Sequence, residues 1–178
     1  MEIIKSKEIY ITPWVSFMER SVVMPKTNVI ENYYSLSQAD YVNVLAVTPD
    51  GRIPLVRQYR PALEKFTIEL PGGLCDKGET PEKSALRELQ EEVGLISTTP
   101  PLLLGPLSPD TGRLENNLWG FIVNAKECAK KSWKPEPGVE RLFVSRKELY
   151  ELILNGKFDH ALHIAIVGLA VFKGAFKW

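Results

Sequence analysis

The chain has 178 residues, of which 44% are hydrophobic and 25% charged, a composition that fits one well-packed globular domain. Its 22 Lys and Arg balance its 22 Asp and Glu, so no overall field favours nucleic acid or an anionic membrane, and any phosphate site must be local. Cys75 and Cys128 make no disulfide framework and the N-terminus lacks a signal-peptide core, so we expect a cytoplasmic protein.

The N-terminal segment reads as short strands over residues 8–36, with a turn near residues 24–28. A hairpin of this length cannot bury both faces by itself, so it must lie on the main domain or on a second subunit. We therefore expect residues 1–39 to be an N-terminal β extension, which makes a homodimer if it lies on a second subunit, and residues 40–178 to be the main domain.

The next segment predicts a central hairpin. Residues 41–48 form a β-branched run that ends at the turn signal Pro49-Asp50-Gly51, and a second run follows over residues 52–60. By local rules alone, Pro54 would move the second strand to an edge or a bulge. A further strand, FTIELPGG, leads to Gly72, whose carbonyl is a candidate metal ligand because glycine lets the backbone approach closely.

A helix is predicted over residues 81–93. Thr80 is suited to accept from the first free N–H groups, Pro81 fits the first helical position, and Gly94 fits the left-handed residue after a helix. The helical period places two groups of side chains on different faces, with the apolar group packed on a sheet and the acidic group directed outward. The apolar group is Leu86, Leu89 and Val93, and the acidic group is Glu88, Glu91 and Glu92.

The acidic face has two interpretations. It is a solvated charged surface, or it is a site where a divalent cation relieves the repulsion among like charges. Hard oxygen ligands favour Mg²⁺, with Mn²⁺ as the alternative, and these ions bind phosphate oxygens.

The C-terminal half contains a proline- and glycine-rich loop that leads into a strand at residues 118–123, a loop at residues 128–139 and another strand after Glu140. Two helices follow, over residues 145–157 and about 160–172, and the apolar run 161–172 is too short to span a bilayer. His160 and His163 have a spacing compatible with a metal pair, but on so apolar a helix we favour core or cap histidines.

The stretch from Gly73 to Leu95 resembles the Nudix hydrolase signature. Gly73, Glu79 and the run Arg87-Glu88-Leu89-x-Glu91-Glu92-x-Gly94-Leu95 match every fixed position of that signature. The resemblance implies an α/β fold, a Nudix α/β/α sandwich with a mixed sheet and an N-terminal antiparallel β-sheet extension. It also implies hydrolysis of a nucleoside diphosphate linked to another moiety, with no nucleic-acid or membrane partner.

Outside this stretch, the chain resembles the ADP-ribose pyrophosphatase subgroup. Gln58-Tyr59-Arg60-Pro61, followed by Glu69 in E-L-P-G-G, is similar to a pattern of those enzymes in which the arginine holds the diphosphate and the glutamate contacts substrate. Pro109 and Glu115 stand near positions that the subgroup uses, although Asp110-Thr111 replaces a usual glycine. As an alternative, Arg60 and Glu69 form a surface ion pair.

This resemblance implies a set of site residues and Mg²⁺-dependent cleavage of ADP-ribose to AMP and ribose 5-phosphate. The implied metal residues are Gly72, Glu88, Glu91 and Glu92. The implied catalytic residues are Glu91, Glu92 and Glu140, with Glu136 as the second choice for the late-loop base. The implied substrate-binding residues are Trp14, Arg60, Glu69, Leu74, Pro109 and Glu115, with Tyr33 or Tyr34 as a second aromatic that stacks on adenine.

Other functions remain open at this point. Another nucleotide-sugar substrate such as GDP-mannose, or NADH, shares the signature, so only the flanking residues favour ADP-ribose. A Nudix-fold sensor that binds ADP-ribose without cleaving it is expected to have lost acidic residues of the signature. This chain keeps all of them, which favours an enzyme.

Overall fold

The computed structural model describes residues 1–128, 133–134 and 136–178. The chain forms two compact units, one of residues 1–40 with 108–117 and the other of residues 41–107 with 118–178. In the first unit, the backbone of Leu36 accepts from Glu115 N–H at 3.1 Å and donates to the Arg113 carbonyl at 2.7 Å. The segment 108–117 therefore folds with the N-terminal strands, although it is distant from them in sequence.

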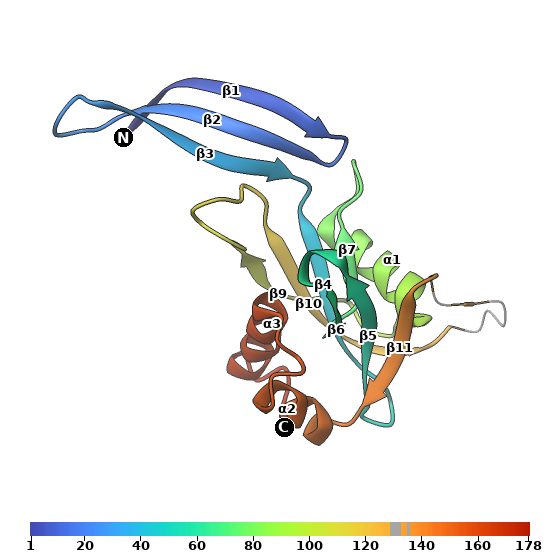
Figure 1. The fold of residues 1–178 in the computed structure, drawn as a ribbon. Coiled ribbons are helices and arrows are strands. Elements are labelled where there is room, and N and C mark those ends of the chain that lie inside the picture. The colour runs from blue at the N-terminus through green and yellow to red at the C-terminus, as the bar shows by residue number, and fades with distance from the viewer. Residues whose placement is uncertain (129–132, 135) are drawn as a thin grey trace. The chain divides into compact units, whose positions relative to one another are not determined.

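The N-terminal unit is an antiparallel sheet of β1 (Glu2–Thr12), β2 (Val15–Val23) and β3 (Ile30–Gln38), in that order (Figure 1). The predicted turn is present: Met24 N–H donates to the Val29 carbonyl at 2.9 Å, and Asn28 has a φ of 54°. β1 begins earlier than predicted, and residues 13–14 separate it from β2. The predicted hairpin is therefore a three-stranded sheet.

The second unit contains two sheets. In the first, β4 (Tyr41–Val47) and β10 (Leu118–Glu127) run parallel, while β7 (Gly72–Leu74), β8 (Leu95–Ser97) and β9 (Leu102–Leu107) pair antiparallel with them. The second has the order β11 (Val139–Val144), β5 (Ile53–Arg60) and β6 (Lys65–Glu69), with the short 3₁₀ helix η1 (Pro61–Leu63) between β5 and β6. The expected mixed sheet is present, but β9 lies in a segment predicted as loop, and the short strand β8 was not predicted.

The prediction of a central hairpin is wrong, because β4 and β5 belong to different sheets. The Asp50–Gly51 turn exists, with Gly51 at a φ of 81°, yet β4 pairs with β10 and β5 pairs with β6 and β11. Pro54 is tolerated in the middle strand since β6 pairs only with residues 56–60 of β5. At Pro54, β5 therefore pairs only with Phe143 of β11. The N–H that proline lacks interrupts no pairing with β6, because β6 does not extend to this residue.

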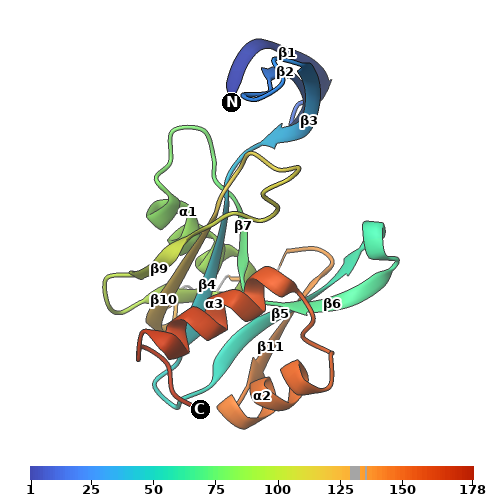
Figure 2. The same ribbon diagram turned by 90° about the vertical axis from the view of Figure 1, so that its left-hand side faces the viewer.

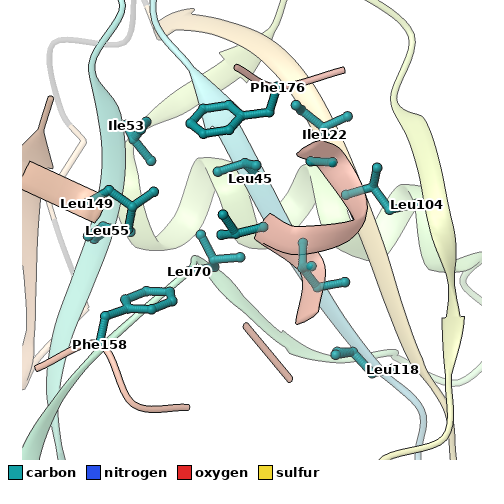
Figure 3. Packing of buried hydrophobic residues seen from close by; sticks show 13 residues of the cluster. Leu45, Ile53, Leu55, Leu70, Leu104, Leu118, Ile122, Leu149, Phe158 and Phe176 are labelled. Atoms are coloured by element: carbon teal, nitrogen blue, oxygen red, sulfur yellow. The ribbon is translucent and has the colours of Figure 1, made fainter. Parts of the chain in front are cut away.

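Both faces of the parallel pair are covered, which explains why β4 is apolar on both faces apart from the buried Asn43. Val42, Val44 and Ala46 pack with residues of α1 (Pro81–Val93). Leu45, on the opposite face, packs with residues of α2 (Arg146–Leu154) and α3 (Ala161–Phe172) (Figure 3). Figure 2 shows α3 lying across this face of the sheet. The unit is therefore an α/β/α sandwich, as predicted.

The helices of this unit have the predicted starts. Ser145 caps α2 and forms a reciprocal capping box with Glu148, and His160 is the residue that precedes α3. α3 lies close to β10 because Gly120 has no side chain there: a Cβ would come within 1.8 Å of Ile166 Cδ1. None of the helices in the described part of the chain has both the length and the apolar character needed to cross a bilayer.

Candidate active site

The helix α1 forms because its end signals are local. Thr80 Oγ1 accepts from Lys83 N–H at 3.4 Å, and Gly94 adopts a φ of 68° while its N–H bonds to the Gln90 carbonyl at 3.1 Å. The predicted range of residues 81–93 is confirmed.

The acidic side chains of α1 do not all point outward. Glu92 is only 5% exposed, and its Oε2 accepts from Gly72 N–H at 2.8 Å. The prediction that the acidic group is directed outward is wrong for Glu92, because β7 packs against the helix. At this contact, a Cβ on Gly73 would lie 2.5 Å from Glu88 Oε1, so a side chain there would displace the Glu88 carboxylate. The structure thus brings together Gly72, Glu88 and Glu92, which the sequence predicted as metal residues.

Burial changes the proton affinity of these carboxyl groups. It raises the pKa of Glu92 to about 7, against the opposing hydrogen bond from Gly72 and with added repulsion from Glu88 and Glu136. Burial also raises the pKa of Glu88, and the charges of Glu91 and Glu136 add to this effect while Arg87 opposes it. A cluster that resists ionisation at neutral pH is stabilised when a cation joins it.

Arg87 ties the acidic face to the loop before the helix. Its Nη1 donates to Glu88 Oε1 at 2.7 Å and to Glu91 Oε2 at 3.0 Å, and its Nη2 donates to the Leu74 carbonyl at 3.1 Å. Its Nε donates to Glu79 at 3.2 Å. Arg87 therefore joins Glu79, Glu88 and Glu91, and Leu74 is held beside the acidic cluster through its backbone.

The donor set fits a hard divalent cation. Glu88 and Glu92 supply carboxylate oxygens one helical turn apart, and Glu91 is more exposed on the same side. Carboxylate and carbonyl oxygens without sulfur or imidazole favour Mg²⁺ or Mn²⁺ over softer ions.

Arg60 and Glu69 form a bidentate ion pair. Arg60 Nε and Nη2 donate to Glu69 Oε1 and Oε2 at 2.8 and 2.6 Å, and Thr67 Oγ1 donates to Oε1 at 2.6 Å. Glu69 is 2% exposed, so this is not a surface pair. Burial opposes ionisation of Glu69, but the hydrogen bonds from Arg60 and Thr67 outweigh it and lower the pKa to about 2. Arg60 also lines a pocket with Thr67, Glu69 and His160, and its charge acts on Glu92.

The two histidines lie beside this pair. Ligand atoms of Glu69, His160 and His163 lie within 4.8 Å of one another. However, His163 Nδ1 accepts from Leu70 N–H at 3.0 Å, and burial lowers the pKa of His163 to about 3. The neutral ring then carries its proton on Nε2 and has no free lone pair for a metal. The core and cap interpretation of the histidines holds, since His163 is buried and His160 precedes α3.

The two candidates for the late-loop base differ in surroundings. Glu140 lies on β11, its side chain is 57% exposed, and it pairs with Arg57 at 2.9 Å. The charge of Glu136, in contrast, raises the pKa of both Glu88 and Glu92. This electrostatic interaction with the acidic cluster favours Glu136 over Glu140. Residues 129–132 and 135 of the predicted loop lie outside the described residues.

The remaining predicted residues belong to the N-terminal unit and are described within it. Trp14 lies in the turn after β1 and is 68% exposed. Glu115 accepts hydrogen bonds from Arg20 and Ser35, and Pro109 lies in a bend of the same segment. Tyr34 stacks on Phe17 with ring centroids 5.5 Å apart.

The sequence analysis missed Trp133 and Arg141, which contact the C-terminal end of α1. The available signal was a tryptophan in the otherwise polar segment KKSWKPEPG, where a large aromatic side chain needs a packing partner.

Comparison with known proteins supports the resemblance. A family model described as NUDIX domain matches residues 38–162. The chain is 55% identical over 53 residues to the ADP-ribose pyrophosphatase of Bacillus subtilis (strain 168), a match that covers 30% of this chain and 29% of that protein. It is 27% identical over 139 residues to the ADP-sugar pyrophosphatase of Mus musculus, which covers 70% of this chain and 62% of that protein.

These alignments span less than two thirds of either relative. Among solved structures, one described as an ADP compounds hydrolase aligns with a TM-score of 0.80 at 18% identity, covering 98% of this chain and 95% of that chain. At this identity, the likeness concerns the fold alone.

Proposed function

Because the chain belongs to the Nudix family, we propose that it hydrolyses the diphosphate of ADP-ribose with Mg²⁺, giving AMP and ribose 5-phosphate. The observation that carries the proposal is the buried Glu88–Glu92 cluster against Gly72 and Gly73. The choice of ADP-ribose is supported by the Arg60–Glu69 fork, which follows the pattern noted in the sequence, and by the activities for which the two aligned relatives are named.

In this proposal, Glu88 and Glu92 hold the metal, with Glu91 and the Gly72 carbonyl as further ligands. A Mg²⁺ ion held by these residues would supply positive charge to the diphosphate and to the oxygens at the reacting phosphorus. Arg87 keeps Glu88 and Glu91 in place through its hydrogen bonds. The protein thus supplies a rigid acidic surface on which a phosphate can be oriented before reaction.

Arg60 is the proposed clamp for the phosphate that is not attacked. Two of its N–H groups are directed at Glu69, and the rest of the guanidinium is available for phosphate oxygens. Glu69 acts through Arg60 as a positioning residue, because its buried carboxylate fixes the orientation of the guanidinium.

Glu136 is the proposed general base, with Glu140 second. A water oxygen forms the new bond to phosphorus, the bridging P–O bond breaks, and Glu136 takes the proton from the attacking water. Glu140 is instead directed at Arg57, with which it forms an ion pair at 2.9 Å. Glu136→Gln should lower kcat by about 10²–10⁴-fold, whereas Glu140→Gln should change it little. The reverse result would return the role to Glu140.

The N-terminal unit is the proposed dimerisation element, and Trp14, Pro109 and Glu115 are proposed nucleoside contacts. Its sheet exposes Ile9, Ile30 and Tyr34, an apolar surface that a second copy would bury. Light scattering should give twice the chain mass, and Trp14→Ala should raise KM for ADP-ribose more than it changes kcat. An active monomer would rule out a dimer-dependent site.

A substrate panel tests the function. ADP-ribose, GDP-mannose, NADH and ATP are each incubated with Mg²⁺ or with a chelator, and product nucleotides are separated by chromatography. We expect metal-dependent cleavage with the highest kcat/KM for ADP-ribose. Preference for GDP-mannose or NADH would keep the Glu88–Glu92 site but reject the role of the Arg60 pocket in selecting ADP-ribose. Binding without turnover would make the protein a sensor.

A further inference from the structure

The C-terminal end of α1 is held by groups from a later segment of the chain. Trp133 Nε1–H donates to the Glu91 carbonyl at 3.1 Å, Arg141 Nη1–H donates to the Val93 carbonyl at 2.8 Å, and Cys128 N–H donates to the Gly94 carbonyl at 2.9 Å. The last carbonyls of a helix lack partners within the helix, so these bonds complete its C-terminal end. The Arg141 charge also interacts favourably with the helix dipole there.

The Trp133 indole packs directly on Gly94. A Cβ at this glycine would lie 2.5 Å from Trp133 Cδ2, so glycine is required here for contact with the indole as well as for its positive φ of 68°. Arg141 Cζ lies 4.6 Å from the centroid of the same ring. Trp133 is therefore fixed by a hydrogen bond, by a close backbone contact and by a cation–π contact.

The chain between these two anchors carries Glu136. It is attached to the end of α1 at Trp133 and again at Arg141 on β11. Between them, Val139 N–H donates to the Glu136 carbonyl at 3.0 Å and closes the turn that leads into β11. Because both anchors contact the helix that carries Glu88 and Glu92, they restrain the position of Glu136 relative to that helix.

We propose that Trp133 is a positioning residue that holds Glu136 in place relative to the acidic face of α1. This inference rests on the proposed function, since the role of Glu136 belongs to it. Trp133 itself touches the helix end and not the reacting atoms. Its effect on the reaction is exerted through the short span from residue 133 to residue 141.

Kinetics of single variants give the first test. Trp133→Ala should lower kcat for ADP-ribose by about 10- to 100-fold, because a small displacement of a reacting group has effects of that size, while KM changes little. Trp133→Phe keeps an aromatic ring against Gly94 and Arg141 but loses the indole N–H, so its kcat should lie between those of wild type and Trp133→Ala. Trp178→Ala, which removes a half-exposed tryptophan from the C-terminus of the same unit, is the matched control and should have wild-type kcat.

A double-mutant cycle tests the route of the effect. If Trp133 acts through Glu136, adding Trp133→Ala to Glu136→Gln should lower kcat no further than Glu136→Gln alone. If the reductions in kcat of the two single variants multiplied in the double variant, the proposal would be overturned. Wild-type kcat in Trp133→Ala would also overturn it. Should the alanine variant fail to fold, the same cycle is run with Trp133→Phe.

Two measurements without substrate separate positioning from damage to the helix. Hydrogen exchange at the Val139 amide should be faster in Trp133→Ala, and Mg²⁺ affinity by calorimetry should stay within about threefold of wild type because the helix ligands are unchanged. Unchanged exchange, or a large loss of Mg²⁺ affinity, would contradict the inference. Absence of hydrolysis by the wild-type enzyme would instead reject the proposed function, and these two outcomes are distinct.

Discussion

Arg60 donates two hydrogen bonds to Glu69, from Nε to Oε1 at 2.8 Å and from Nη2 to Oε2 at 2.6 Å, and the Glu69 carboxylate is buried. The pair joins the β5–β6 connection to the interior of the unit. The Arg60 guanidinium also lines a pocket, and its positive charge acts to lower the pKa of Glu92. One interaction thus serves both the fold and the proposed substrate clamp.

Loss of the partner for Arg60 should cost stability and substrate affinity together. We expect Arg60→Ala to lower the free energy of unfolding by about 1–3 kcal/mol, because it leaves the buried Glu69 carboxylate with Thr67 as its remaining side-chain donor, while solvent screens the half-exposed Arg60. Arg60→Lys keeps the charge but not the fork, so it should be closer to wild type in stability while KM rises. Urea denaturation and steady-state kinetics measure the two effects. Equal stability of wild type and Arg60→Ala would show that Glu69 does not need its partner.

His163 should make the protein sensitive to acid. Burial lowers the pKa of His163 from 6.5 to about 3, so the unfolded chain binds the proton more readily than the folded one between these values. Stability is therefore complete above pH 6.5 and falls as the pH decreases below it, by up to about 1.4 kcal/mol per pH unit. His163→Asn can still accept from Leu70 N–H and should lack this loss between pH 6.5 and 5. Parallel urea midpoints for wild type and variant over that range would refute the prediction.

Glu92 should be a source of instability in the metal-free protein. The pKa of Glu92 is about 7 in the folded state and 4.5 in the unfolded state. In the presence of a chelator, the free energy of unfolding should therefore decrease as the pH rises from 4.5 through 7. At pH 8, Glu92→Gln should raise the free energy of unfolding by about 1–3 kcal/mol, since it removes a buried negative charge. Adding Mg²⁺ should reduce the difference in free energy of unfolding between Glu92→Gln and wild type, because the ion should stabilise only the wild type. A variant less stable than wild type in chelator would contradict this.

Gly73 should be intolerant of a side chain for a local reason. A Cβ would lie 2.5 Å from Glu88 Oε1, so Gly73→Ala must displace that carboxylate or β7. We expect kcat to fall by about tenfold or more, as for loss of a group that orients a metal ligand. Gly168→Ala in α3 is the control: its Cβ would meet only Phe172 at 3.9 Å, and it should keep full activity and gain a few tenths of a kcal/mol or more in stability. Wild-type kinetics in both variants would show that Glu88 is not held as described.

Features with local causes could be predicted from the sequence. The bounds of α1 follow from Thr80, Pro81 and Gly94, and the capping of α2 follows from Ser145. The pairing of β4 could not be predicted in this way, because its parallel partner begins at Leu118 and the nearby Asp50–Gly51 turn suggested β5 instead. Strand β9 was missed since Gly105 and Pro106 are usual loop residues.

The candidate site shows the same division. The signature residues were identified in sequence, but the burial of Glu92 depends on the approach of β7, which periodicity cannot show. Arg60 and Glu69 were both identified, whereas the fork between them and its support by Thr67 required the structure. The docking of Trp133 on Gly94 joins residues separated by a segment with no regular pattern, so only the three-dimensional arrangement reveals it.

The most direct test of the central claim is the release of AMP from ADP-ribose by wild type and by Glu92→Gln, each with saturating Mg²⁺ and each shown to be folded by circular dichroism. We predict rapid release by the wild type that stops with chelator, and a loss of about a hundredfold or more in the variant. A folded Glu92→Gln protein with near wild-type release would show that the acidic face of α1 is not the catalytic metal site.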